Sequence, residues 1–329
     1  MVIAVVGATG LVGRMMLKIL EEHNVFVDKL LPAASAKSKG KKVTFRGEEI
    51  PVCTVEEAIA QKPDIALFSA GGNASLKYAP LFAAVGTYVI DNSSAWRRDK
   101  DVPLVVPEIN LHAIQKQHRI IANPNCSTIQ MVVAIAPLHK KFIIKRLVIS
   151  TYQSVSGSGI KGINQLRDEM IDTLVFEPAY PHQILLNVIP HGGEFDETGY
   201  TSEEIKLEFE TRKILDSPEM AITSTVVRVP VKGGHSMAVN IEFEKPFTIE
   251  EVNEILKNSA GIQVTDNPAK NEYPMPLFAE NHDEVFVGRI RRDFSIENGL
   301  NIWVTADNLR KGAATNAVQI AEFLIKNKF

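Results

Sequence analysis

The segment with the clearest capacity for chemistry is Asn123-Pro124-Asn125-Cys126-Ser127-Thr128. It opens an apolar run, residues 129–138, which is long enough for a helix that Ser127 or Thr128 could cap. At a helix N-terminus, unpaired backbone N–H groups and the helix dipole favour a thiolate. The sequence therefore predicts that Cys126 is a nucleophile. The ordinary alternative is a small buried cysteine.

A nucleophilic cysteine needs an acid or base beside it, and two histidines are candidates. His235 lies in Gly233-Gly234-His235-Ser236, which we expect to be a loop between strands at residues 223–230 and 237–243. His191 sits beside two glycines and is an equally good candidate from the sequence alone.

Several charged residues suit an anionic substrate. Arg228 lies in an otherwise apolar strand, so it must be at an edge, paired, or bound to a ligand. Arg97 follows the end of a predicted strand and suits an anion clamp, although the neighbouring Arg98 makes an ordinary arginine an equally simple interpretation. Glu203 and Lys206 share a face of a predicted helix. Such spacing most often indicates an ion pair on an exposed helix.

The N-terminus has the pattern of a dinucleotide-binding turn. Residues 2–6 predict a buried strand, Gly7-Ala8-Thr9-Gly10-Leu11-Val12-Gly13 follows, and a helical pattern comes next. Strand, glycine turn and helix are the context that the dinucleotide fingerprint requires. The turn is therefore expected to hold a pyrophosphate at the helix N-terminus, although a plain connecting turn is the alternative.

The next loop favours NADP over NAD. NAD-binding folds usually carry an acidic residue about 20 residues after the glycines. No Asp or Glu lies between Lys29 and Gly47, and Ser35, Lys37 and Ser38 with further lysines stand there instead. Cationic and hydroxyl side chains suit a 2′-phosphate, although a solvated lysine loop is the alternative.

Alternating strand and helix patterns continue to about residue 124, which predicts an α/β fold with a doubly wound, Rossmann-type parallel sheet. Past residue 145 the pattern changes to strands and helices that fit an α+β domain with a mainly antiparallel sheet. Thr201 and Glu204 fit a capping box that starts a helix. A last amphipathic helix is expected at residues 310–326.

Composition narrows the function classes. The net charge of −3 gives no basic excess for nucleic acid. No apolar stretch reaches the roughly 18 residues that span a membrane, and we expect no signal peptide. Two distant cysteines make no disulfide framework, which indicates a cytoplasmic protein. We expect no metal site.

The motifs together resemble bacterial aspartate-semialdehyde dehydrogenases over essentially the whole chain. The matching blocks, in family order, are the glycine turn at 7–13, Asp91-Asn92-Ser93-Ser94-Ala95-Trp96-Arg97, residues 123–128, Thr151-Tyr152-Gln153-Ser154-Val155-Ser156-Gly157, residues 203–206 with 210–215, Arg228-Val229-Pro230-Val231, Gly234-His235-Ser236, and Asp307-Asn308-Leu309-Arg310-Lys311-Gly312-Ala313-Ala314.

The resemblance implies a role for each matching residue. Cys126 would be the nucleophile and His235 the acid/base, with Gln153 orienting the substrate and Asn125 supporting the site. Arg228 would bind the substrate carboxylate and Glu203 its amino group, while Arg97 and Lys206 would hold phosphate. The remaining cofactor contacts would come from Lys37, Ser38, Ser156, Gly157, Asn316 and Gln319. Lys37 stands where relatives often carry arginine, and a lysine offers a point charge rather than a fork.

The activity implied is NADPH-dependent reductive dephosphorylation of L-aspartyl 4-phosphate to L-aspartate 4-semialdehyde, through a cysteine thioester. This reaction serves lysine (by way of diaminopimelate), threonine, methionine and isoleucine synthesis. The implied domains are 1–124 for NADP, 125–307 for catalysis and dimerisation, and 308–329 as a helix packing back on the first domain. A homodimer, or a tetramer built from two dimers, is expected. The alternatives are a catalytically silent NADP-binding paralogue and an acyl-phosphate reductase of the N-acetyl-glutamyl phosphate reductase type.

Overall fold

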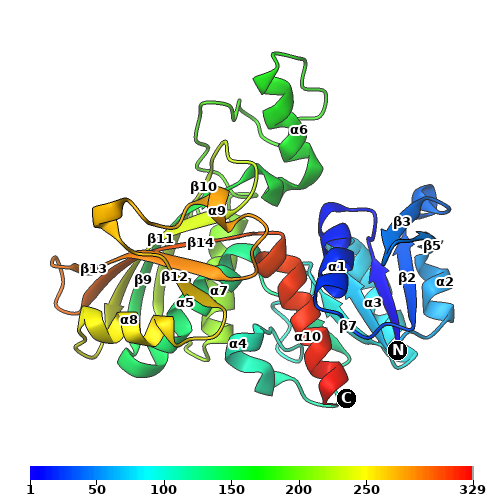
Figure 1. Ribbon diagram of the computed structural model, residues 1–329, viewed down its shortest axis with the longest axis horizontal. Coiled ribbons are helices and arrows are strands. Elements are labelled where there is room, and N and C mark those ends of the chain that lie inside the picture. Colours follow the sequence, from blue (N-terminus) through cyan, green and yellow to red (C-terminus); the bar gives the residue numbers. More distant parts are fainter. Residues whose placement is uncertain (328–329) are drawn as a thin grey trace. The chain divides into compact units, whose positions relative to one another are not determined.

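The computed structural model describes residues 1–327, and the chain divides into two units (Figure 1). The first unit contains residues 1–125 together with the described residues from Ala313 onward. The second unit is Cys126–Gly312. The chain therefore leaves the first unit at Asn125, directly before the predicted nucleophile, and returns to it for the last helix.

The first unit is built on a six-stranded sheet in the order β5-β2-β1-β6-β7-β8. Every pairing in it is parallel, which confirms the predicted doubly wound sheet. Its strands are β1 (Val2–Val6), β2 (Lys29–Ala34), β5 (Cys53–Thr54), β6 (Ile65–Phe68), β7 (Tyr88–Asp91) and β8 (Ile120–Ala122). A separate hairpin, β3 (Lys42–Phe45) and β4 (Glu48–Pro51), follows β2.

Helices bury both faces of this sheet, as a parallel sheet requires. On one face Ile3 and Val5 pack with α1 (Leu11–Glu22) and α10 (Thr315–Lys326). On the other face Ala4 and Val6 pack with α2 (Val55–Ala60) and α3 (Gly72–Ala84). A short helix, α4 (Pro107–Asn110), precedes β8. The last helix of the chain thus completes the core that the first strand begins.

The glycine turn between β1 and α1 is fixed by close backbone contacts. Gly7 has a φ of +89°, and a Cβ on it would lie 2.3 Å from the carbonyl oxygen of Ser69. A Cβ on Gly13 would lie 2.2 Å from the carbonyl oxygen of Gly7. Only glycine allows these approaches, so the two residues hold β1, β6 and α1 together at the end of the sheet.

The second unit is built on a six-stranded sheet in the order β10-β9-β11-β14-β13-β12. The pairs β9–β11, β11–β14 and β13–β14 are antiparallel, while β9–β10 and β12–β13 are parallel. The sheet is mainly antiparallel, as predicted. Its strands are β9 (Ile144–Gln153), β10 (Ala221–Arg228), β11 (His235–Phe243), β12 (Ile262–Val264), β13 (Val285–Asp293) and β14 (Gly299–Ala306).

Three helices cover one face of the second sheet: α5 (Cys126–Phe142), α7 (Ser202–Ile214) and α8 (Ile249–Lys257). Side chains on the opposite face, among them Tyr152, Ala238 and Trp303, stay partly exposed. The helix α6 (Gly159–Met170) stands away from the sheet, and the short α9 (Pro276–Ala279) lies beside β14 (Figure 1). The second unit therefore has one covered and one open sheet face.

Three local expectations need correction. The helix α5 begins at Cys126 itself, so Ser127 and Thr128 lie inside its first turn and do not cap it from outside. His235 is the first residue of β11 and does not lie in the preceding loop. The expected helix at 310–326 starts as a short π-helix, Arg310–Ala314, and continues as α10.

The Gly7–Gly13 contact gives a stability prediction. Gly13→Ala forces Cβ against the Gly7 carbonyl, so we expect the free energy of unfolding to fall by about 1–3 kcal/mol. Urea unfolding followed by circular dichroism measures this. The matched control is Gly72→Ala in α3, where no atom of residues 1–327 lies within 4 Å of the new Cβ, and alanine favours a helix. Equal stability of the two variants would contradict the contact.

Candidate active site

Three polar side chains predicted from the sequence meet at one end of the second sheet. Arg228 ends β10, Gln153 ends β9 and His235 begins β11, and these strands are neighbours in the order β10-β9-β11. The register pairs Arg228 with Gln153, and Ser236 with Tyr152. All three side chains are buried. Strand pairing alone therefore places a cation, an amide and an imidazole side by side.

The amide of Gln153 connects this cluster to the start of α5. Its Nε2 donates a hydrogen bond of 2.8 Å to the hydroxyl oxygen of Ser127, the residue after Cys126. Within residues 1–327, Oε1 of Gln153 is buried and has no hydrogen-bond partner. Gln153 thus bridges the sheet and the cysteine, and it keeps an acceptor for another group.

Cys126 is partly buried at the first position of α5. Gly312, in the short π-helix, lies against it: a Cβ on Gly312 would be 3.0 Å from the Cβ of Cys126 and 3.2 Å from Nε2 of Gln130. Because Gly312 has no side chain, the Cys126 side chain is not crowded from this side. Such π-helical turns occur often at functional sites.

His235 is completely buried, and one ring nitrogen is fully engaged. The backbone N–H of Ser154 donates to Nδ1 at 3.0 Å, and the Ser154 hydroxyl lies 3.0 Å from the same atom. The hydroxyls of Ser154 and Ser156 each lie 3.1 Å from Oδ1 of Asn308, which also accepts from the backbone N–H of Gly234 at 3.1 Å. One amide oxygen thus ties together the two loops that flank the ring.

The other ring nitrogen lies close to Gly157. A Cβ on Gly157 would lie 3.0 Å from Nε2 of His235 and 2.8 Å from Nη1 of Arg228. Both nitrogens are buried and have no hydrogen-bond partner within the described chain. Burial, and then the nearby Arg228 guanidinium, lower the pKa of His235 from its ordinary 6.5 to about 3. The ring is neutral at physiological pH.

Glu203 and Lys206 pair with each other in the first turns of α7. Nζ of Lys206 donates to a carboxylate oxygen of Glu203 at 2.6 Å, and both side chains are partly exposed. The predicted capping box of Thr201 and Glu204, which starts this helix, is confirmed. A Cβ on Gly192 would lie 3.0 Å from the Cβ of Glu203, so the preceding loop packs against the pair.

The structure separates the two histidine candidates. His191 lies in the loop before α7, partly exposed, and stacks on Phe195 with ring centroids 4.8 Å apart. Its backbone N–H is bonded to the carbonyl of Ile189. His235, in contrast, is buried, as are Arg228 and Gln153 at the same end of the sheet. His235 is therefore the histidine that belongs to the cluster.

In the first unit, the carboxyl ends of β1, β2 and β6 enclose a cavity of about 440 Å³. Its lining includes Gly7, Thr9 and Gly10 from the glycine turn and Ser35 after β2. The first turn of α1 has no side-chain cap, so its backbone N–H groups can meet an anion. These residues fit the pyrophosphate and ribose of a dinucleotide.

Other predicted cofactor residues lie outside the lining of that cavity. Leu11 and Val12 begin α1, with Gly13 behind them. Lys37 and Ser38 form the 3₁₀ turn after Ser35, where Lys37 is exposed. An acidic side chain, Glu56, does line the cavity and accepts a hydrogen bond from the Tyr78 hydroxyl at 2.7 Å.

Buried asparagines fix the segment that leads to the cysteine. Nδ2 of Asn316 donates to the carbonyl of Val105 at 3.0 Å and to Oδ1 of Asn123 at 2.6 Å. Asn123 in turn donates to Asn92 and to the carbonyl of Ala313. Asn316 is fully buried in this network. It therefore positions the residues before Cys126.

Three further predicted residues also belong to the first unit. Arg97 is buried after β7, where its Nη2 donates to the carbonyl of Asn92 at 2.8 Å. Asn125, buried, is the last residue before α5. Gln319, on α10, donates to Glu108 at 3.3 Å.

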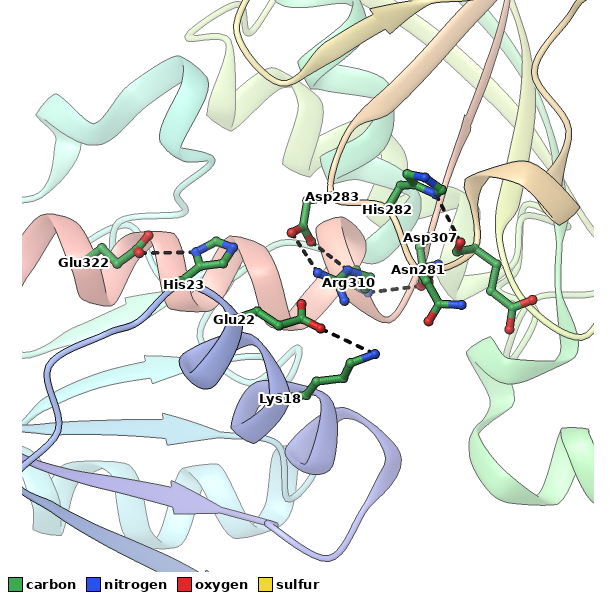
Figure 2. A network of polar contacts seen from close by, with 10 residues as sticks. Lys18, Glu22, His23, Asn281, His282, Asp283, Asp307, Arg310 and Glu322 are labelled. Atoms are coloured by element: carbon green, nitrogen blue, oxygen red, sulfur yellow. Dashed lines mark hydrogen bonds and ion pairs between the residues drawn. The ribbon is translucent and has the colours of Figure 1, made fainter. Parts of the chain in front are cut away.

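The segment after β14 is anchored by acidic side chains (Figure 2). Asp283 receives two hydrogen bonds of 2.9 Å from Arg310, a bidentate pair. Asp307 accepts from the backbone N–H groups of Asn281, Leu309 and Arg310. These contacts fix the chain on both sides of Asn308, the residue that organises the histidine loops.

The sequence motifs did not single out Ser127, Ser154 or Asn308 as site residues. Each acts through one hydrogen bond or a few hydrogen bonds to a group far away in sequence. Asn308 lies 154 residues from Ser154. Their sequence signal is that each lies within a block that resembles the family, at residues 123–128, 151–157 and 307–314.

The comparisons with known proteins agree with this geometry. A family described as semialdehyde dehydrogenase, NAD binding domain, matches residues 2–117, and one described as semialdehyde dehydrogenase, dimerisation domain, matches residues 135–311. An aspartate-semialdehyde dehydrogenase of Aquifex aeolicus is 54% identical, with 98% of each chain covered. That of Bacillus subtilis is 44% identical, covering 98% of this chain and 97% of the relative.

This chain belongs to the aspartate-semialdehyde dehydrogenase family. A crystal structure of aspartate semialdehyde dehydrogenase II from Vibrio cholerae complexed with ASA superposes with a TM-score of 0.95, at 45% identity, over 100% of this chain and 99% of that one. The Candida albicans enzyme with NADP matches with a TM-score of 0.78 at 27% identity, over 98% of each chain.

Family membership decides the general class of the protein. The chain is an oxidoreductase with a nicotinamide cofactor domain and a dimerisation domain. Within residues 1–327, no helix combines the length and apolarity needed to cross a bilayer. In the same range, no three His, Cys, Asp or Glu side chains are grouped as metal ligands would be.

The buried histidine gives a pH prediction. Because the folded pKa of His235 lies near 3 and the unfolded value near 6.5, the unfolded chain binds more protons between these values. Stability from this residue is therefore lost as the pH falls below 6.5. From pH 7.5 to 5.0, the wild type should lose roughly 2 kcal/mol more than His235→Gln in urea unfolding. Parallel pH dependences of the two proteins would mean that His235 titrates normally.

Proposed function

We propose that this chain reduces L-aspartyl 4-phosphate to L-aspartate 4-semialdehyde and phosphate, with NADPH as reductant and a thioester on Cys126 as intermediate. The reaction is reversible and supplies amino-acid synthesis. The observation that carries the proposal is the grouping of Gln153, Arg228 and His235 at the strand ends, with Gln153 bonded beside Cys126. An acyl phosphate suits this chemistry because a thiolate displaces phosphate readily.

Cys126 is the nucleophile in this proposal. Its sulfur attacks the acyl carbon and phosphate departs, which leaves a thioester on the enzyme. The acyl carbon then receives a hydride, which the bound nicotinamide supplies, and collapse of the resulting oxyanion releases the aldehyde and the thiolate. Gln153, whose Nε2 contacts Ser127 at the start of α5 and whose Oε1 is buried without a partner in the described chain, orients the acyl group, and Asn125, the residue before the nucleophile, supports the site.

Charged residues give the substrate its register. Arg228 binds the α-carboxylate, because a buried guanidinium with a free Nη1 needs an anion. Glu203 receives the α-amino group. Lys206 and Arg97 hold the phosphate and stabilise charge as it departs. The Glu203–Lys206 pair places one group of each sign on the first turns of α7.

NADP is the proposed cofactor. The glycine turn from Gly7 to Gly13 and the N-terminus of α1 hold the pyrophosphate. Ser35, Lys37 and Ser38 meet the 2′-phosphate, since the turn they form adjoins the cavity and carries positive charge. Ser156, Gly157, Asn316 and Gln319 complete the predicted set. A cytoplasmic location fits an enzyme whose two cysteines are both free thiols.

The deciding experiment runs the reaction in reverse. The purified protein receives L-aspartate 4-semialdehyde, phosphate and NADP, and absorbance reports reduced cofactor. We expect phosphate-dependent turnover that falls at least roughly a thousandfold in Cys126→Ala, because the nucleophile is gone. Cys53→Ala is the matched control and should keep its activity, since Cys53 lies in β5 of the first unit.

Each other outcome of this assay has a meaning. Full turnover by Cys126→Ala would overturn the thioester mechanism. Turnover with NAD but not with NADP would overturn the assignment of the Lys37 turn. Cofactor binding without turnover would point to a silent paralogue, and turnover only with N-acetyl-glutamate semialdehyde would point to the related acyl-phosphate reductase.

We also propose that the chain forms a homodimer across the open face of the second sheet. Tyr152 and Trp303 pack there with ring centroids 5.3 Å apart, beside Ala238 in the central strand β11. These side chains are partly exposed although they lie at the centre of a sheet. Apolar and aromatic side chains in such a position suit a subunit interface.

A charge at the centre of this face should separate the subunits. Ala238→Glu places two carboxylates at the interface, so we expect sedimentation velocity to show a shift from dimer to monomer. Gln263→Glu, on the edge strand β12, is the control and should stay dimeric. Unchanged association of Ala238→Glu would exclude this face as the interface.

A further inference from the structure

The side chain of Glu204 joins the first turn of α7 to the edge strand β10. One carboxylate oxygen, Oε2, accepts the backbone N–H of Thr201 at 2.6 Å, which completes the capping box. The other, Oε1, accepts the backbone N–H of Val226 in β10 at 2.9 Å. Glu204 is buried, and hydrogen bonds to an ionised carboxylate are roughly twice as strong as those between neutral groups. The residue that caps the helix therefore also attaches the helix to the sheet.

Two further contacts hold the same elements together. The hydroxyl of Ser224 donates to the backbone carbonyl of Glu204 at 3.3 Å. A Cβ on Gly192 would lie 2.5 Å from Cγ1 of Val226 and 3.0 Å from Cβ of Glu203, so the backbone of the loop before α7 packs against both. β10 is the last strand of its sheet, and the N–H groups on its outer edge need partners from elsewhere in the chain. Glu204 is that partner for Val226.

The attachment lies between the two residues proposed to bind the amino-acid end of the substrate. Ser224, Val226 and Arg228 alternate along β10 and are all buried, so their side chains point to one face of the sheet. α7 covers that face, since the Ser224 hydroxyl reaches the carbonyl of Glu204. Glu203, which precedes Glu204, is proposed above to receive the α-amino group, and Arg228 the α-carboxylate. The bond between Glu204 and Val226 thus ties the backbone of the first residue to that of the second.

We propose that Glu204 is a positioning residue for substrate specificity, which fixes the spacing between Glu203 and Arg228 so that one substrate meets both. This inference rests on the function proposed above. A substrate that carries its amino and carboxylate groups on one carbon has a fixed spacing between the two charges, so the residues that bind them must keep a matching spacing. A substrate with the carboxylate alone needs only Arg228 and is insensitive to that spacing. Misplacement of a binding group by about 1 Å can cost about a hundredfold in rate.

Glutamine at position 204 breaks the attachment while it keeps the size of the side chain. A carboxylate offers two acceptor oxygens, whereas an amide offers one oxygen and a donating NH2 group. In Glu204→Gln one of the two backbone N–H groups, that of Thr201 or that of Val226, therefore faces a donor. A buried N–H without an acceptor is costly, so α7 and β10 must move relative to each other.

The test compares two substrates that differ in the amino group. L-aspartate 4-semialdehyde carries this group, and succinate semialdehyde has the same chain, aldehyde and carboxylate without it. The ratio of their kcat/KM values, the first divided by the second, should fall about tenfold to a hundredfold in Glu204→Gln. Succinate semialdehyde is also measured as a competitive inhibitor, so that its binding is known even where its turnover is slow. Its inhibition constant should change less than the KM for L-aspartate 4-semialdehyde.

Two control variants weaken a helix cap but leave the attachment. Thr201→Ala removes the other half of the capping box, a 3.4 Å contact to the N–H of Glu204, and keeps both carboxylate bonds. Glu251→Gln changes the equivalent glutamate of α8, whose carboxylate accepts only from the backbone N–H of Thr248 within residues 1–327. We expect both variants to keep the wild-type ratio. Thermal unfolding followed by circular dichroism establishes that each variant is folded at the assay temperature.

Ser224→Ala covers the case in which Glu204→Gln does not fold. It removes the Ser224 bond to the backbone of α7 and should lower the same ratio about threefold. A wild-type ratio in folded Glu204→Gln, or in Ser224→Ala where Glu204→Gln does not fold, would overturn the proposal. An equal fall in Thr201→Ala would do so as well, since loss of the cap alone would then explain it. Wild type that does not turn over L-aspartate 4-semialdehyde would instead refute the proposed function, and this inference with it.

Discussion

The pairing register of three strands is the constraint on which the site depends. β9 pairs in parallel with β10 and antiparallel with β11, so Gln153, Arg228 and His235 reach the same end of the sheet. A shift of one residue would turn each side chain to the opposite face. The register is held by the apolar residues between them, Leu147 and Ile149 of β9 among them, which must stay under the covering helices. Because side chains alternate along a strand, burial of the apolar residues also determines which way Gln153, Arg228 and His235 point.

Local patterns in the sequence predicted much of this molecule. The glycine turn, the parallel strands of the first unit and the capping box of Thr201 depend on neighbours within a few residues, and all three are present. Sequence motifs also singled out Cys126 and His235 as candidate site residues. The starts of α5 and β11 were predicted too late. Secondary-structure propensity depends on nearby residues, so it does not show that Cys126 and His235 are held in regular structure by contacts with distant residues.

What the sequence could not predict is the arrangement of buried polar groups. The choice between His191 and His235 required burial and strand position, which depend on the whole sheet. The hydrogen-bond role of Asn308 joins segments separated by 74 and 154 residues, and no periodicity encodes such a link. Asn316 was assigned to the cofactor by resemblance, yet its amide hydrogen bonds to Asn123 and Val105 and positions the segment before Cys126.

The return of the chain to its first unit has a consequence for biogenesis. Ala317, Ile320, Ala321 and Leu324 of α10 cover one face of the sheet that begins at Ile3. During translation α1 covers only part of this face until α10 leaves the ribosome, whereas every strand of the second unit precedes α10. Apolar strands that wait for a distant helix are exposed to wrong pairing and to chaperones. The strands of the nucleotide-binding unit are made before those of the second unit. Its hydrophobic core is nevertheless completed last, because it needs α10.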